Sequence, residues 1–210
     1  MKTKFFGLIL GGLMLIAGSA QAAVLSLDLT GSSSAPLPGN FNPGGFPGSI
    51  VLPGTITIFD SPAIAGGIGG LQLDTGAKLT FEYLGKEAGF SNTFDFGGDL
   101  FNTDTSAVGD SVQANALAGI IPFLFHTSSL TAQNGGPVAA GISIAFADLG
   151  DGSFLAMFND GGGGDFDFDD LVVRVSVSAV PLPAAAWLLL SAILGLVSFS
   201  RVRRSGTQTA

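Results

Sequence analysis

Short apolar runs, separated by clusters of Gly, Asn, Asp and Ser, recur through the middle of this sequence. Such runs are typical of β-strands, and the intervening clusters are typical of turns. They cover residues 24–29, 55–59, 78–84, 123–126, 141–146, 154–158 and 171–177. This pattern predicts an all-β domain, a single jelly-roll-like β-sandwich of about seven to nine strands. One segment, near Ser111 to Ala118, instead suggests a short helix.

Residues 32–54 have a different composition, rich in Gly, Pro and Ser, with five prolines. This predicts either an irregular loop or an arm that crosses the surface of the domain. The chain has no cysteine, which excludes disulfides, thiol catalysis and thiolate metal sites. A domain of this size can still bury enough apolar surface to fold without disulfides.

The N-terminus has the pattern of a secretory signal peptide. Lys2 and Lys4 precede an apolar stretch from Phe5 to Ala17, and Ala20-Gln21-Ala22 offers the small residues of a cleavage site. We therefore expect a signal helix in residues 1–22, with cleavage after Ala22.

The C-terminus contains a second uncharged apolar run, from Ala184 to Phe199, with Trp187 near one end. Sixteen helical residues reach roughly 24 Å, against about 30 Å for the hydrocarbon core of a bilayer. Basic side chains that follow the run, at Arg201, Arg203 and Arg204, can extend to the interface and complete the span. By the positive-inside rule they stay cytoplasmic, so the chain before Pro181 is expected outside.

Residues 180–204 resemble a known sorting signal. The element Val180-Pro181-Leu182-Pro183, then Trp187, the apolar run and the arginines, is similar to the PEP-CTERM signal, with Leu182 where that family has Glu. The prolines forbid a helix and hold an extended backbone that a processing enzyme can grip. The resemblance implies a substrate of an exosortase in a Gram-negative bacterium, exported through the inner membrane with only transient membrane contact. The expected location is the cell envelope, the cell surface or an extracellular matrix of exopolysaccharide.

Residues 23–178 form the expected mature body and are about the right length for one domain. They contain three basic residues, Lys78, Lys86 and Arg174, and all sixteen acidic residues, for a net charge of −13. Such a body repels nucleic acid and anionic lipid, and it suits multivalent cations. We therefore expect no nucleic-acid partner.

Five aspartates gather just before the last predicted strand, at Asp160, Asp165, Asp167, Asp169 and Asp170. Carboxylates this dense repel one another unless solvent or a cation screens them, and calcium prefers oxygen ligands. The alternating register of residues 171–177, continued backward, would bury Asp167 and Asp169, so a loop or bulge is expected before Leu171. The spacing fits neither an EF-hand nor a glycine-rich calcium nonapeptide. The interpretations are thus a calcium site or a solvated acidic turn with Phe166 and Phe168 tucked inward.

Residues 158–173 and 79–94 resemble segments of a β-domain of unknown function that occurs in PEP-CTERM and other secreted bacterial proteins. There, a Gly-rich turn leads into an Asp-rich motif and a Leu-Val-Val strand. The resemblance implies a surface β-domain without an assigned enzymatic activity, and it leaves stabilisation by calcium open.

Catalytic patterns are weak. His126 is the only histidine and ends an apolar run before Thr127, but no Gly-x-Ser-x-Gly elbow occurs. Glu82, Glu87 and the aspartates could supply a carboxylate pair for glycoside hydrolysis, although some pair looks suitable among sixteen acids. Eighteen Phe against one Tyr and one Trp suit core packing better than sugar stacking. We expect a non-enzymatic protein.

Three functions remain open from the sequence. The first is an exported surface or matrix protein associated with exopolysaccharide and biofilm. The second is a calcium-dependent module that binds a glycan or a neighbouring protein. The third is a secreted hydrolase.

Overall fold

The computed structural model describes residues 22–44, 50–60, 68–87, 89–161, 166–178 and Ala192. This part of the chain contains fourteen β-strands, all in antiparallel pairs. The strands are β1 Leu25–Asp28, β2 Ser33–Pro36, β3 Thr55–Asp60, β4 Gly70–Leu73, β5 Ala77–Gly85, β6 Thr93–Asp95, β7 Asp99–Asn102, β8 Ser111–Ala116, β9 Gly119–Ile120, β10 Leu124–His126, β11 Thr131–Gln133, β12 Ser143–Asp148, β13 Phe154–Asn159 and β14 Leu171–Val177. The predicted all-β fold class is confirmed, but the expected number of seven to nine strands was too low, because short strands between the apolar runs were not recognised.

The largest sheet has seven strands in the order β2-β3-β12-β13-β14-β5-β8. β14 pairs with β13 on one side and with β5 on the other, so the last strand of the body is internal to the sheet. All six residues of β13 are buried. A continuous apolar run of this kind is expected where both faces of a sheet are covered.

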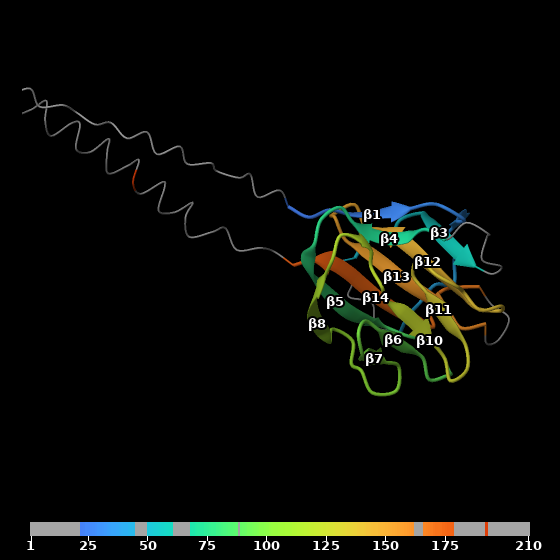
Figure 1. Cartoon of the computed structure of the whole chain (residues 1–210). Coiled ribbons are helices and arrows are strands. Elements are labelled where there is room, and N and C mark those ends of the chain that lie inside the picture. Colours follow the sequence, from blue (N-terminus) through green and yellow to red (C-terminus); the bar gives the residue numbers. More distant parts are fainter. Residues whose placement is uncertain are drawn as a thin grey trace, which may run out of the picture.

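One hydrophobic cluster packs one face of this sheet against two smaller sheets, β11-β10-β6-β7 and β1-β4-β9 (Figure 1). Phe125 of β10 stacks on Phe158 of β13 with ring centroids 5.1 Å apart, and Phe81 of β5 meets Phe94 of β6 at 5.4 Å. These contacts join the large sheet to a small one, an arrangement consistent with a β-sandwich. They agree with the expectation that phenylalanine serves core packing.

A second hydrophobic cluster covers the opposite face of the seven-stranded sheet. Side chains alternate across a strand, so Leu155 and Val172 face this cluster while their neighbours face the first. Residues 37–44, called the arm below, contribute Leu37 and Phe41 to the cover over these side chains. The arm thus crosses the back of the sheet, as one of the two sequence interpretations expected.

Two sequence expectations about local structure were wrong. Residues 111–116 form β8, an edge strand paired with β5, rather than a helix. Their burial alternates with a period of two, because one side of β8 rests on the core. The Gly/Pro-rich segment is also not wholly irregular, since β2 lies within it and pairs with β3. Pro36 fits there because β2 is an edge strand.

The predicted terminal segments lie almost entirely outside the described residues. Of the signal peptide only Ala22 is described, and of the sorting signal at 180–204 only Ala192. Within the part of the chain that the structure describes, no helix is both long and apolar enough to cross a bilayer.

Candidate metal centre

A short acidic segment, residues 166–170, joins the end of the Gly-rich turn to β14 and is called the strap below. The expected break in register is present, because the strap is not strand and β14 begins only at Leu171. Phe168 has a φ of 64°, and it is the only non-glycine with positive φ among the described residues. A bulky residue rarely adopts this conformation, and here burial in the second cluster holds it.

Of the two interpretations of the aspartates, the solvated acidic turn is contradicted by burial. Asp167 and Asp169 are 3% and 1% exposed and therefore do not lie in solvent. Phe168 is buried, but Phe166 is 70% exposed, so only one of the two phenylalanines is tucked inward. The strap therefore places carboxylates inside the protein and leaves an aromatic ring in solvent.

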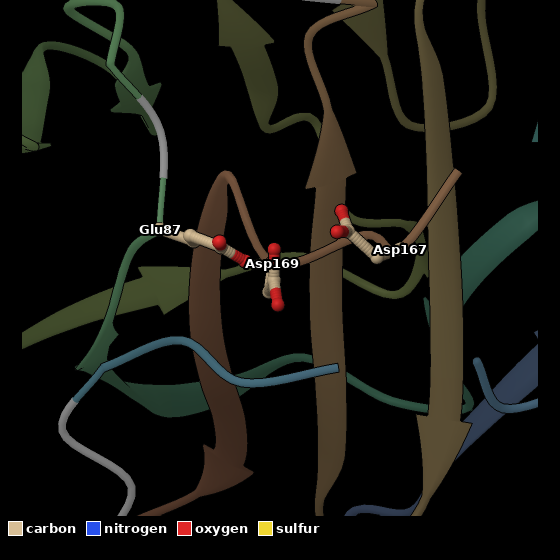
Figure 2. A group of neighbouring side chains, drawn as sticks. All are labelled: Glu87, Asp167 and Asp169. Atoms are coloured by element: carbon tan, nitrogen blue, oxygen red, sulfur yellow. The ribbon is translucent and has the colours of Figure 1, made fainter. Parts of the chain in front are cut away.

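Three carboxylates from two distant segments meet at the strap (Figure 2). Glu87, just after β5, lies beside Asp167 and Asp169, and one carboxylate oxygen from each residue falls within 4.8 Å of the others. Two full charges that close repel by about 3 kcal/mol or more at an effective dielectric constant of about 20. The group therefore needs a proton or a cation to be stable.

Polar groups from the arm hold two of these carboxylates in place. The Asn40 Nδ2 amide donates to Asp167 Oδ2 at 2.8 Å, and the Asn42 backbone N–H donates to Asp169 Oδ2 at 2.5 Å. The Glu87 backbone N–H donates to the Asp169 carbonyl oxygen at 2.8 Å. The second side-chain oxygen of Asp169, Oδ1, is buried without a hydrogen-bond partner among the described residues.

The electrostatics of Asp169 reflect this setting. Burial raises the pKa of Asp169 from 3.8 to about 7. The hydrogen bond from Asn42 opposes that rise, while the neighbouring Asp167 and Glu87 add to it. Asp169 can thus hold a proton close to neutral pH, and a cation can take the place of that proton.

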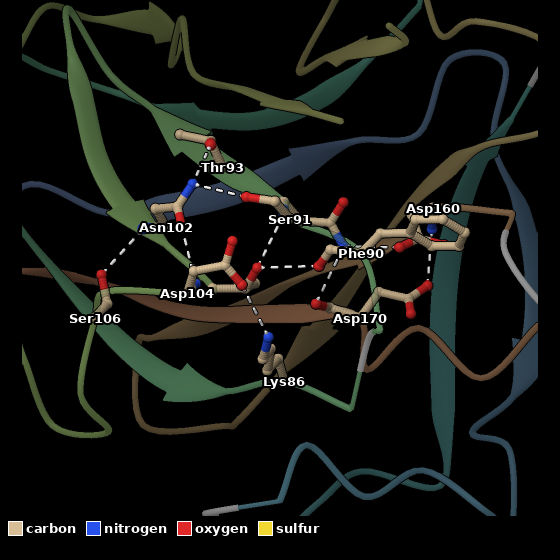
Figure 3. Close-up of polar contacts among 11 residues, drawn as sticks. Lys86, Phe90, Ser91, Thr93, Asn102, Asp104, Ser106, Asp160 and Asp170 are labelled. Carbon is tan, nitrogen blue, oxygen red and sulfur yellow. Dashed lines mark hydrogen bonds and ion pairs between the residues drawn. The ribbon is translucent and has the colours of Figure 1, made fainter. Parts of the chain in front are cut away.

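A second polar network contains Asp160 and Asp170, the other two of the five predicted ligands that the structure describes (Figure 3). The Asp160 backbone N–H donates to Asp170 Oδ2 at 2.8 Å, and Asn92 Nδ2 donates to Asp160 Oδ2 at 2.8 Å. Asn92 is fully buried, and Thr103 binds its backbone on both sides. Burial, followed by the charges of Asp160, Asp167 and Asp169, raises the pKa of Asp170 to about 7.

The predicted calcium ligands are therefore divided between two places. Asp167 and Asp169 come together, whereas Asp160 and Asp170 are bonded to each other in the second network. Asp165 lies outside the described residues. Sequence reasoning considered Glu87 with the aspartates only as a catalytic carboxylate pair and not as a metal ligand, and it missed Asn40 and Asn42 altogether. The available signal was the position of Glu87 shortly after the predicted strand 78–84.

The residues considered for catalysis have structural contacts. His126 ends β10, with Nδ1 3.4 Å from the Thr127 carbonyl oxygen and Nε2 3.5 Å from Asp99 Oδ1. The Thr127 hydroxyl accepts two backbone N–H groups of the following turn. Glu82 lies within β5, in register with Arg174 of β14. His126 is therefore a strand-end histidine with polar contacts to Thr127 and Asp99.

Comparison with known proteins gave no match, either to protein-family models, to curated proteins or to solved structures.

Proposed function

We propose that this chain is an exported, non-enzymatic protein of the cell surface or extracellular matrix. In this proposal an exosortase processes residues 180–204, the chain is associated with the inner membrane only transiently, and the mature body is associated with exopolysaccharide. The body would be a jelly-roll-like β-sandwich between the two removable ends.

One observation carries this proposal: two apolar segments with basic flanks enclose a body with a net charge of −13. The basic residues at Lys2, Lys4 and Arg201–Arg204 belong to the ends, where they orient a chain during export. The body keeps its acidic surface and a core that needs no disulfide. Such a surface stays soluble in a hydrated, cation-rich matrix.

Fractionation of cells that express an exosortase tests the proposal. We expect wild-type protein at the surface in a shortened form, and a variant lacking residues 180–204 released into the medium. A variant lacking only residues 205–210, which follow the arginines, is the matched control and should behave as wild type. If the 180–204 deletion leaves the distribution and the mass change as they are in wild type, the sorting role is wrong.

A calcium-dependent module for a glycan or a neighbouring protein is a second candidate function. The Glu87–Asp167–Asp169 group favours it, because a bound cation can use free coordination positions for sugar hydroxyls or a partner's carboxylate. Co-sedimentation with purified exopolysaccharide in calcium and in chelator separates the two functions. Binding that disappears in chelator supports the module, and binding that is equal in both solutions excludes it.

A further inference from the structure

Three segments that are far apart in sequence converge at the strap. The arm contacts it through Asn40 and Asn42, whose partners Asp167 and Asp169 each lie 127 residues further along. Lys86 and Glu87 lie on the third segment, and a Cβ added to Gly44 would be only 2.9 Å from the Lys86 carbonyl oxygen. The arm, the end of β5 and the strap are therefore packed closely around the three carboxylates.

No basic side chain among the described residues forms an ion pair with these three carboxylates. The body has only three basic residues besides His126, and all four are described. The ion pairs found among the described residues are Lys86–Asp104, His126–Asp99 and Arg174–Asp151, and none involves the three carboxylates. The charge at the strap must therefore be balanced by something other than a basic residue of the body.

A buried oxygen points to the same need. Asp169 is 1% exposed, and its Oδ1 has no hydrogen-bond partner among the described residues. The two nearby donors from the arm are already used, one on Asp167 and one on the other oxygen of Asp169. Buried carboxylate oxygens in folded proteins are almost always bonded, and one that is not calls for a proton, a water or a metal ion.

We propose that Glu87, Asp167 and Asp169 bind one hard divalent cation of the calcium class, and that this cation fastens the arm and the end of β5 to the strap. Three carboxylates with no thiolate or imidazole form a ligand set that hard cations prefer. Exposure of Glu87 gives the ion a route from solvent, while the buried aspartates hold it. The cation site does not depend on the proposed export of the protein. The second candidate function, a calcium-dependent binding module, does require the cation site.

The position of the arm gives the cation a structural effect. Leu37 and Phe41 of the arm cover the second hydrophobic cluster, and Phe168 of the strap is part of that cluster. Without the cation, repulsion at the strap weakens the attachment of the arm, and the apolar back of the sheet becomes accessible. Occupancy of the site therefore limits local opening of the arm, and binding to the folded state also raises its global stability.

Calcium titration of the full-length protein in detergent, after removal of metal by chelator, tests binding. We expect one saturable site by calorimetry, weakened at least about tenfold in Asp169→Asn and in Glu87→Gln. Asp99→Asn removes the same charge from an exposed residue outside the group and should leave the affinity unchanged. No saturable binding at millimolar calcium, or equal weakening in Asp99→Asn, overturns the proposal.

Melting curves distinguish a variant that has lost the cation site from a variant that is misfolded. In chelator, Asp169→Asn should melt at or above the wild-type temperature, because it removes a repelling charge. In calcium, the wild type should gain stability and the variant should not. If Asp169→Asn melts below wild type in chelator, the carboxylate stabilises the fold without a cation and the proposal is wrong.

Limited digestion with trypsin reports on the attachment directly. The cleavage sites within the body are Lys78, Lys86 and Arg174, and Lys86 immediately precedes the ligand Glu87. We expect calcium to slow cleavage at Lys86 by about fivefold or more, while cleavage at Lys78 within β5 serves as the internal reference. Equal rates at Lys86 with calcium and with chelator contradict a cation that fastens these segments.

Discussion

Buried amide side chains connect segments that no strand pairing joins. Asn134, at the end of β11, is 2% exposed. Its Oδ1 accepts the Leu71 N–H at 2.8 Å, and its Nδ2 donates to the carbonyl oxygens of Leu71 and Ile121, both at 2.8 Å. One side chain thus bonds three buried backbone groups. Its loss takes the acceptor from the Leu71 N–H, while the Leu71 and Ile121 carbonyl oxygens each keep one backbone donor, the N–H of Ile121 and of Phe123.

Asn134→Ala should lower the free energy of unfolding by about 2–4 kcal/mol, because it removes three buried hydrogen bonds. Asn115→Ala, on the exposed side of the edge strand β8, should change it by less than about 0.5 kcal/mol. Urea denaturation of both variants measures the difference. A loss below about 1 kcal/mol for Asn134→Ala would mean that water replaces the amide.

Asp170 makes stability depend on pH. Its pKa is raised in the folded protein from 3.8 to about 7, so the stabilisation by its bound proton is full below pH 4 and is lost as pH rises through 7. For an isolated carboxyl this pKa shift corresponds to roughly 4 kcal/mol in the free energy of unfolding. Because neighbouring aspartates titrate together, the contribution of Asp170 alone is smaller than this.

In chelator, Asp170→Asn should therefore be more stable than wild type at pH 7.5, and the difference should shrink toward pH 5. The asparagine Oδ1 can still accept the Asp160 N–H, so the hydrogen bond survives the change. Thermal melts across this pH range give the answer. Parallel pH profiles of the two proteins would contradict the raised pKa.

At the scale of elements, strands with strong local patterns were predictable. Residues 173–177 alternate apolar and polar side chains after the apolar residues 171 and 172, and β14 covers 171–177. β8 was mistaken for a helix although its residues alternate, because Ala and Gln favour helices and Val112 is its only strongly apolar residue; its strand form depends on pairing with β5. In the site, the density of aspartates indicated Asp167 and Asp169. Glu87, Asn40 and Asn42 come from other segments of the chain. A local sequence pattern cannot predict contacts between residues so far apart, such as Asn40 and Asp167, which are 127 residues apart.

The strap offers a matched pair of phenylalanines that tests its role as an element. Phe168 is 2% exposed in the second cluster, and Phe166, two residues earlier, is 70% exposed. Phe168→Ala should lower the free energy of unfolding by about 2–4 kcal/mol, since it leaves a cavity beneath the arm. Phe166→Ala should change it by less than about 0.5 kcal/mol. Similar losses in both variants would show that the strap is not anchored through Phe168.

At the scale of the whole molecule, charge and apolarity are separated along the chain. The acidic residues all belong to the body, and five of the eight basic residues belong to the two ends. The body accommodates its charge in a fold with two hydrophobic clusters, one on each face of the large sheet. We propose that the ends direct where the chain goes and that the strap sets how firmly the arm is attached to the body.

Export and C-terminal processing can be checked by the intact mass of the protein recovered from the surface of exosortase-positive cells. We expect a chain that begins at Ala23 and ends close to Pro183, without Arg201, Arg203 and Arg204. A surface chain that retains both Lys2 and Arg204, or a full-length chain found only in the cytosol, would show that export and processing do not occur as proposed.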